Sequence, residues 1–169
     1  MQQYLLCKYL DLIHQAKHSI KVSTPYFVPD TKMLKALINA AKSGVEITLL
    51  IPKYSDHALL KHAAYWYYQK LIMAKINIYE FSSRMLHSKN IIIDDEIAVI
   101  GSANMDYRSF FLNNEIMLFS QQHNLLNYIL QDFKTNIVSS EQVSLKQATS
   151  RSTLTVISTF VAYLLRRWL

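Results

Sequence analysis

The chain has 169 residues, of which 51% are hydrophobic, enough for one domain with a sizeable core. Its 18 basic and 12 acidic residues give a net charge of +6, which favours anionic partners such as phospholipid headgroups or nucleic acid without choosing between them. The single cysteine, Cys7, excludes an internal disulfide and argues against a cysteine-rich structural metal site.

The N-terminal stretch has apolar side chains at helical spacing. These are Leu5, Leu6, Tyr9, Leu12 and Ile13, which fall on one stripe. We therefore expect an amphipathic helix here and no signal peptide.

Strands and helices alternate after this helix. We expect strands at 19–27, 45–51, 76–81 and 114–120, and helices at 31–43, 55–75 and 123–138. Asp30 has the position of an N-cap for the second helix, and Gly44 follows its end. Four consecutive aromatic residues, 65–68, are too many for one buried face, so core packing and a dimer or membrane contact remain alternatives for them.

Residues 86–101 predict a β-hairpin. Three consecutive isoleucines place 86–93 in a strand, on which His87 and Lys89 share a face. A turn at Asp94 and Asp95 would lead into a second strand and place Ser102 roughly opposite His87. With the alternating elements, this hairpin predicts an α/β fold: a mixed β-sheet flanked by helices on both faces.

The polar residues of this hairpin suit the cleavage of a phosphodiester. Imidazole can attack phosphorus or protonate a leaving alkoxide, so His87 has either role. Lys89 supplies positive charge, while the Ser102 hydroxyl and the Asn104 amide add donors for phosphate oxygens. Gly101, one of only two glycines, allows a close approach of the backbone. The structural alternative, a buried hairpin with a hydrogen-bonded histidine, does not account for the whole set.

The stretch resembles the HKD motif of the phospholipase D superfamily, whose pattern is His-x-Lys, four residues, Asp, six residues, Gly-Ser-x-Asn. The wider chain is similar to the second, C-terminal catalytic repeat of bacterial cardiolipin synthases, in four segments: TPYFVPD (24–30), IPKYSDH (51–57), LHSK (86–89) and GSANMDYRSFFLNNE (101–115). The resemblance implies a phospholipase D-like fold and covers roughly residues 4–135.

The resemblance also implies roles for individual residues. His87 forms a phosphohistidine or protonates the leaving group, and Glu115 orients it through a hydrogen bond. Lys89 acts with Ser102 and Asn104 to hold the substrate phosphate. Two further motif positions, Asp94 and Gly101, are structural, and two aromatic residues, Tyr26 and Phe27, line the substrate site.

One departure concerns the number of motifs. The family's active sites use two HKD motifs, yet this chain has no second His-x-Lys. Either two copies pair about a two-fold axis or the missing motif belongs to an N-terminal half of a longer enzyme.

The C-terminal residues 152–165 are largely uncharged and apolar, and they are flanked by Arg151 and by Arg166, Arg167 and Trp168. A helix of this length reaches about 21 Å, short of the roughly 30 Å hydrocarbon core. Two alternatives follow: a helix packed on the core, or an interfacial helix with its basic, aromatic end at the headgroups. We therefore divide the chain into a catalytic domain, 1–140, and a linker with a terminal helix, 141–169.

The resemblance predicts a phosphatidyltransferase of phospholipid biosynthesis. It would transfer a phosphatidyl group between two phosphatidylglycerol molecules to form cardiolipin, with no metal and no organic cofactor. Its expected location is peripheral, on the cytoplasmic side of the bacterial membrane, and nucleic acid is the less favoured partner. Alternatives are a homodimeric HKD phosphodiesterase or nuclease, a phospholipase D hydrolase, and an isolated half that is inactive without its partner motif.

Overall fold

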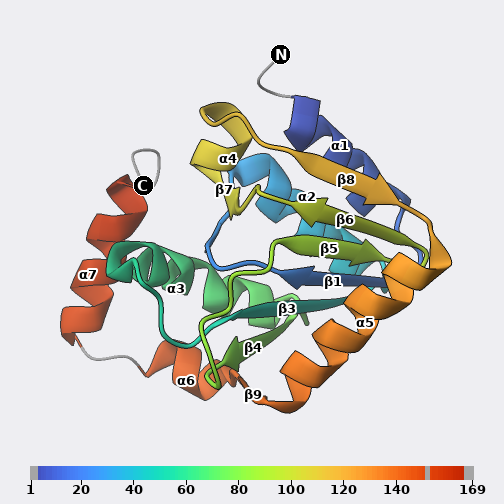
Figure 1. Ribbon diagram of the computed structural model, residues 1–169. Helices are drawn as coiled ribbons and strands as arrows, with labels where there is room; N and C mark the ends of the chain where they lie inside the picture. Colours follow the sequence, from blue (N-terminus) through green and yellow to red (C-terminus); the bar gives the residue numbers. More distant parts are fainter. Residues whose placement is uncertain (1–3, 151–152, 166–169) are drawn as a thin grey trace.

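The protein is described by a computed structural model that covers residues 4–150 and 153–165 (Figure 1). Within these residues the main sheet consists of β1 (Ser19–Ser23), β3 (Glu46–Pro52), β4 (Asn77–Phe81), β5 (Asn90–Ile93), β6 (Ile97–Gly101), β8 (Met117–Ser120) and β9 (Ser140–Gln142). Their order is β8-β6-β5-β1-β3-β4-β9. β1, β3 and β4 are parallel, and the remaining neighbours are antiparallel. The mixed sheet predicted from the sequence is confirmed.

Helices cover both faces of this sheet. They are α1 (Tyr4–Gln15), α2 (Thr31–Lys42), α3 (Ala58–Met73), α4 (Tyr107–Phe111), α5 (His123–Val138), α6 (Leu145–Thr149) and α7 (Thr153–Leu165). Side chains of α1, α2 and α3 form one core with the sheet, and α5 forms another. Figure 1 shows α5 in front of the sheet and α2 behind it. The isoleucines of β5 serve both cores: Ile91 and Ile93 join the first and Ile92 the second.

The ends of α2 follow the sequence prediction. The Asp30 carboxylate accepts hydrogen bonds from the backbone N–H groups of Lys32 (3.2 Å) and Met33 (2.8 Å). After the helix, Gly44 has a φ of 97°, which L-residues rarely adopt. The N-cap and the glycine stop are therefore both confirmed.

The strand expected at 19–27 is interrupted, which corrects the prediction. β1 ends at Ser23, and Phe27–Val28 (β2) pair in parallel with Met105–Asp106 (β7) in a separate two-stranded sheet. Pro25 has no N–H for a ladder, and the Thr24 side chain takes over part of the pairing. Its hydroxyl donates to the Tyr26 carbonyl (2.9 Å) and accepts from the Met105 N–H (3.3 Å). This local arrangement brings Tyr26 beside the segment that follows β6.

The expected boundary at residue 140 falls inside the main sheet. β9 pairs antiparallel with β4, and Val143 is part of the first core. α6 follows directly, with Ser144 and Gln147 forming a capping box. Residues 140–149 therefore belong structurally to the sheet domain. At the opposite edge of the sheet, the strand expected at 114–120 begins only at Met117.

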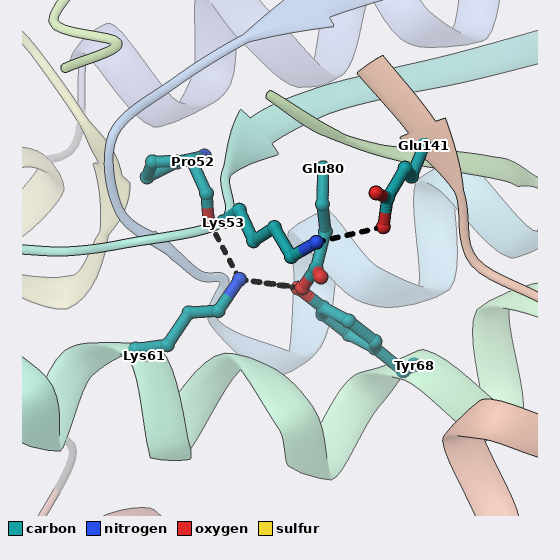
Figure 2. A network of polar contacts seen from close by, with 6 residues as sticks. All are labelled: Pro52, Lys53, Lys61, Tyr68, Glu80 and Glu141. Carbon is teal, nitrogen blue, oxygen red and sulfur yellow. Dashed lines mark hydrogen bonds and ion pairs between the residues drawn. The ribbon is translucent and has the colours of Figure 1, made fainter. Parts of the chain in front are cut away.

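A polar network anchors α3 to one end of the sheet (Figure 2). The Lys61 ammonium lies 2.5 Å from the Glu80 carboxylate and donates to the Pro52 carbonyl (2.6 Å). The Tyr68 hydroxyl also donates to Glu80 (2.9 Å). The side chains of Lys61 and Glu80 are only 10% and 17% exposed, so their charges need each other. The network fixes α3, whose first turn contributes to the candidate site.

Candidate active site

The hairpin β5–β6 brings the motif residues to one edge of the sheet. His87 and Lys89 immediately precede β5, and Ser102 and Asn104 immediately follow β6. The Gly101 N–H donates to the Lys89 carbonyl (3.2 Å), which joins the two ends. The prediction that residues 86–89 belong to the strand was wrong, because β5 begins at Asn90.

The predicted register of the hairpin was also wrong, by one residue. Ile93 pairs with Ile97, so the turn holds three residues and not two, and Asn90 pairs with Ile100. Continued along the hairpin, this register places Ala103, and not Ser102, opposite His87. Asp94 and Asp95 both have positive φ, 54° and 56°, a conformation that acidic side chains tolerate better than most.

Asp94 connects the β5–β6 turn to the start of β1 through hydrogen bonds. Its carboxylate accepts from the backbone N–H groups of Lys17 (2.8 Å), His18 (2.7 Å) and Ser19 (2.8 Å). Burial raises the pKa of this carboxyl, but the backbone donors more than offset that effect and the net pKa is lowered. The geometry suits the structural role expected for this motif position.

Asp94→Ala should therefore destabilise the fold by about 2–3 kcal/mol, because three backbone donors lose a charged acceptor. Asp94→Asn should cost less, since the amide keeps an acceptor and tolerates positive φ. Urea denaturation at neutral pH measures both changes.

A carboxyl with a lowered folded pKa contributes stability that is present above its unfolded pKa and disappears as pH falls through the folded value. The difference between wild type and Asp94→Asn should therefore shrink at acidic pH. Equal stability of all three proteins at neutral pH would contradict the structural role.

Gly101 sits where no side chain fits. A Cβ atom there would collide with the Ile116 carbonyl and lie 2.6 Å from the Met117 sulfur. This close approach lets β8 reach the end of β6, where the Ser102 N–H donates to the Ile116 carbonyl (3.0 Å). Gly101 thus positions the start of β8 against Ser102.

Glu115 contacts Ser102. The Ser102 hydroxyl donates to its carboxylate (2.5 Å), and the Asn113 amide donates to the other oxygen (3.2 Å). The hydrogen bond expected between Glu115 and His87 is not among those of the described residues. In this arrangement Glu115 fixes the hydroxyl of Ser102, which also accepts from the Ile116 N–H (3.0 Å).

Lys89 is partly buried, whereas the His87 side chain is exposed. The Lys89 ammonium donates to the His87 carbonyl (2.9 Å). Burial lowers the pKa of Lys89, and the negative charges of Glu115, Asp106 and Asp56 only partly offset this. The Lys89 ammonium therefore lies against the backbone of His87, where its positive charge can bind an anionic oxygen.

A cavity of about 450 Å³ opens next to the motif. Its wall includes Tyr26, Asn104, the first turn of α3 and three polar residues that were not singled out from the sequence: Asp56, Asp106 and Arg108. The Tyr26 hydroxyl donates to Asp56 (2.8 Å), and burial together with this bond raises the pKa of Tyr26. Burial also raises the pKa of Asp106.

The two aromatic residues expected to line the site differ. Tyr26 does line the cavity, but Phe27 is 1% exposed and packs edge-on against Tyr67 in the core. Phe27 begins β2 and is part of the core, whereas Tyr26 precedes the strand. The expectation for Phe27 was therefore wrong.

Asn104 offers an unsatisfied polar atom at the cavity. Its side-chain oxygen is buried and has no hydrogen-bond partner among the described residues, while its N–H donates to the Ser109 hydroxyl (3.0 Å). Buried polar atoms are almost always paired, so an unpaired one at a cavity wall indicates a place for a bound polar group.

Residues 4–150 and 153–165 contain no group of three or more His, Cys, Asp or Glu side chains arranged to hold a metal ion. Within the same residues, no helix has the length and apolar character needed to cross a bilayer.

Comparison with known proteins agrees with the geometry. Residues 9–137 match the family model for the cardiolipin synthase, PLD-like domain. The chain is 38% identical over 144 residues to a cardiolipin synthase of Halalkalibacterium halodurans, a match that covers 85% of this chain and 29% of that protein. It is 45% identical over 130 residues to a cardiolipin synthase of Geobacillus thermodenitrificans, covering 75% of this chain and 26% of that protein. The chain thus spans less than a third of either relative.

Among solved structures, the fold is similar to Nuc, a phospholipase D family member from Salmonella typhimurium. The TM-score is 0.70 at 23% identity, over 82% of this chain and 90% of that chain. The likeness supports the fold described above.

Proposed function

Because this chain belongs to the cardiolipin synthase, PLD-like domain family, we propose that it transfers a phosphatidyl group from one phosphatidylglycerol molecule to another, forming cardiolipin and releasing glycerol. One observation carries the proposal: the complete motif lies inside the family match, and the hairpin gathers its histidine, lysine, serine and asparagine at one sheet edge. The relatives named cardiolipin synthase support the choice of substrate.

The reaction proceeds in two displacements at phosphorus. First, the imidazole of His87 attacks the phosphorus of the donor lipid. A P–N bond forms, the bond from phosphorus to the oxygen of the headgroup glycerol breaks, and a second histidine gives that oxygen its proton. Next, a headgroup glycerol hydroxyl of the second lipid attacks the same phosphorus and the P–N bond breaks. The proton of the attacking hydroxyl goes to the second histidine.

Three residues hold the phosphate during both steps. The Lys89 ammonium neutralises the charge on the non-bridging oxygens, and the Asn104 amide orients them. The Ser102 hydroxyl has a single proton, which it donates to Glu115, so Ser102 donates to the phosphate only when the substrate displaces Glu115. The glycerol headgroup occupies the neighbouring cavity, where Tyr26 and Asp56 offer hydrogen-bonding groups.

The second histidine comes from another HKD motif, supplied by a second copy of this chain or by an N-terminal half in a longer protein. A net charge of +6 and a lipid substrate favour peripheral attachment at the anionic cytoplasmic face of a bacterial membrane.

The proposal is tested by incubating the protein with phosphatidylglycerol vesicles in the presence of EDTA and separating the lipids by mass spectrometry. We expect cardiolipin and one free glycerol for each cardiolipin formed. This activity should persist in EDTA, because the proposed reaction needs no metal. Phosphatidic acid in place of cardiolipin would identify a hydrolase. Activity that is lost with EDTA and restored by magnesium would contradict the histidine mechanism.

Light scattering on the active preparation tests the two-motif requirement. Activity should be confined to species that contain two HKD motifs. An active monomer with a single motif would contradict this part of the proposal. If the chain leaves lipid intact but cleaves DNA in a salt-sensitive manner, a nuclease would replace the synthase.

A further inference from the structure

The helix α7 has its polar side chains inside and its apolar side chains outside. Its buried or half-buried positions include Ser158, Thr159 and Ala162. The exposed positions within residues 155–165 are all apolar and between 43% and 58% exposed: Val156, Ile157, Phe160, Val161, Leu164 and Leu165. A helix on a protein surface in water normally has the opposite arrangement.

Specific contacts with α3 hold α7 in this orientation. The Tyr163 ring stacks on Trp66 with centroids 4.4 Å apart, and the Ser158 hydroxyl lies 2.9 Å from the Nδ1 atom of His62. Thr159 is buried although its hydroxyl has no hydrogen-bond partner among the described residues. If α7 faced only water, a rotation about its own axis would remove more apolar surface from the solvent. The observed orientation, with the apolar face outward, therefore indicates that this face contacts a second apolar medium.

The sequence around α7 indicates which medium this is. Arg151 lies two residues before the helix, and Arg166, Arg167 and Trp168 follow its last residue directly. Arginines and tryptophan beside an apolar helix face are typical of helices that lie in the headgroup region of an anionic bilayer. The interior of a protein–protein interface is instead depleted in charge.

We propose that α7 is a membrane-docking helix, which inserts its outward apolar face among the lipids of an anionic bilayer while its flanking arginines bind the headgroups. α7 lies at the outer side of the molecule against α3 (Figure 1). The same α3 lines the cavity with Ala58, Leu59 and Leu60. Docking through α7 therefore brings the cavity close to the lipid surface. The proposal concerns binding only and stands whether or not the chain makes cardiolipin.

The test measures flotation with vesicles of equal parts phosphatidylglycerol and phosphatidylcholine. The variant Val161→Glu with Leu164→Glu should bind at least about tenfold more weakly, because it removes apolar insertion and adds repulsion from anionic lipid. Tyr128→Glu with Val138→Glu is the matched control. It adds the same charge at two exposed positions of α5, and its binding should equal that of wild type.

A second variant, Arg166→Gln with Arg167→Gln, tests the proposed attraction between the arginines and anionic headgroups. Both substitutions lie outside the residues of α7. It should reduce binding to anionic vesicles and weaken its dependence on salt. Circular dichroism establishes folding, and Val161→Ser with Leu164→Ser decides by the same criterion if the glutamate pair does not fold. Unchanged binding by the folded α7 variants would overturn the proposal. So would a wild-type dimer that ignores vesicles and becomes monomeric in the glutamate variant, because α7 would then be a protein interface.

Discussion

His87→Ala should abolish cardiolipin formation and leave the fold intact. The imidazole is the proposed nucleophile, and removal of such a group costs at least about 10⁴-fold in turnover. The side chain is exposed, so its loss leaves no cavity in the core. The measurement is cardiolipin produced per unit time from phosphatidylglycerol vesicles, with circular dichroism to establish folding.

His14→Ala is the matched control for this variant. His14 is an exposed histidine on α1 beside the β5–β6 turn, at the end of the hairpin opposite to His87, so its removal should leave turnover within about twofold of wild type. Near-normal turnover in folded His87→Ala would exclude His87 as the reacting group. A loss shared equally by the two variants would show that the assay responds to something other than the site.

The layered fold could be predicted because long apolar patterns determine it. The apolar run of β3, the capped helix α2 and the three isoleucines of β5 each occupy the element expected of them, since burial on one or both faces dictates these patterns. The ends of elements were less predictable. Thr24 and Pro25 end β1 early through a proline and a side-chain hydrogen bond, which apolar periodicity does not encode.

The site residues could be predicted from the motif, but their pairing could not. A single extra residue in the turn, accommodated by positive φ at Asp94 and Asp95, shifted the register and removed His87 from the position opposite Ser102. Likewise, the partner of Glu115 depends on where β8 begins, which Gly101 decides through a close contact with Ile116. Such contacts join residues distant in sequence and leave no periodic signal.

The orientation of α7 shows a different limit. Its polar residues Ser158 and Thr159 lie on one side, which the usual pattern of a surface helix predicts to face water and not the protein. Only the ring of Tyr163 against Trp66 and the contact of Ser158 with His62 decide which side faces α3. The two alternatives expected for the tail are consequently not exclusive: one side of the helix packs on the protein and the other remains uncovered.

Lys89→Met should lower kcat/KM by about 10²–10³-fold, because methionine keeps much of the side-chain length and removes the charge that stabilises the phosphate oxygens. Lys89→Arg should retain more activity than Lys89→Met, since the guanidinium keeps the positive charge. It should remain less active than wild type, because the planar guanidinium is not shaped like the compact ammonium. Equal activity of the methionine variant and wild type would exclude the phosphate-binding role.

The pH profile of kcat/KM makes the test of Lys89 specific. Burial lowers the pKa of Lys89, with partial compensation from Glu115, Asp106 and Asp56. The ammonium must be protonated to hold phosphate, so activity should fall as pH rises through this lowered pKa, earlier than for an exposed lysine. Arginine stays charged throughout that range, so the alkaline fall should disappear in Lys89→Arg. An identical alkaline fall in both proteins would mean that a different group titrates, and the lowered pKa of Lys89 would then have no part in the activity.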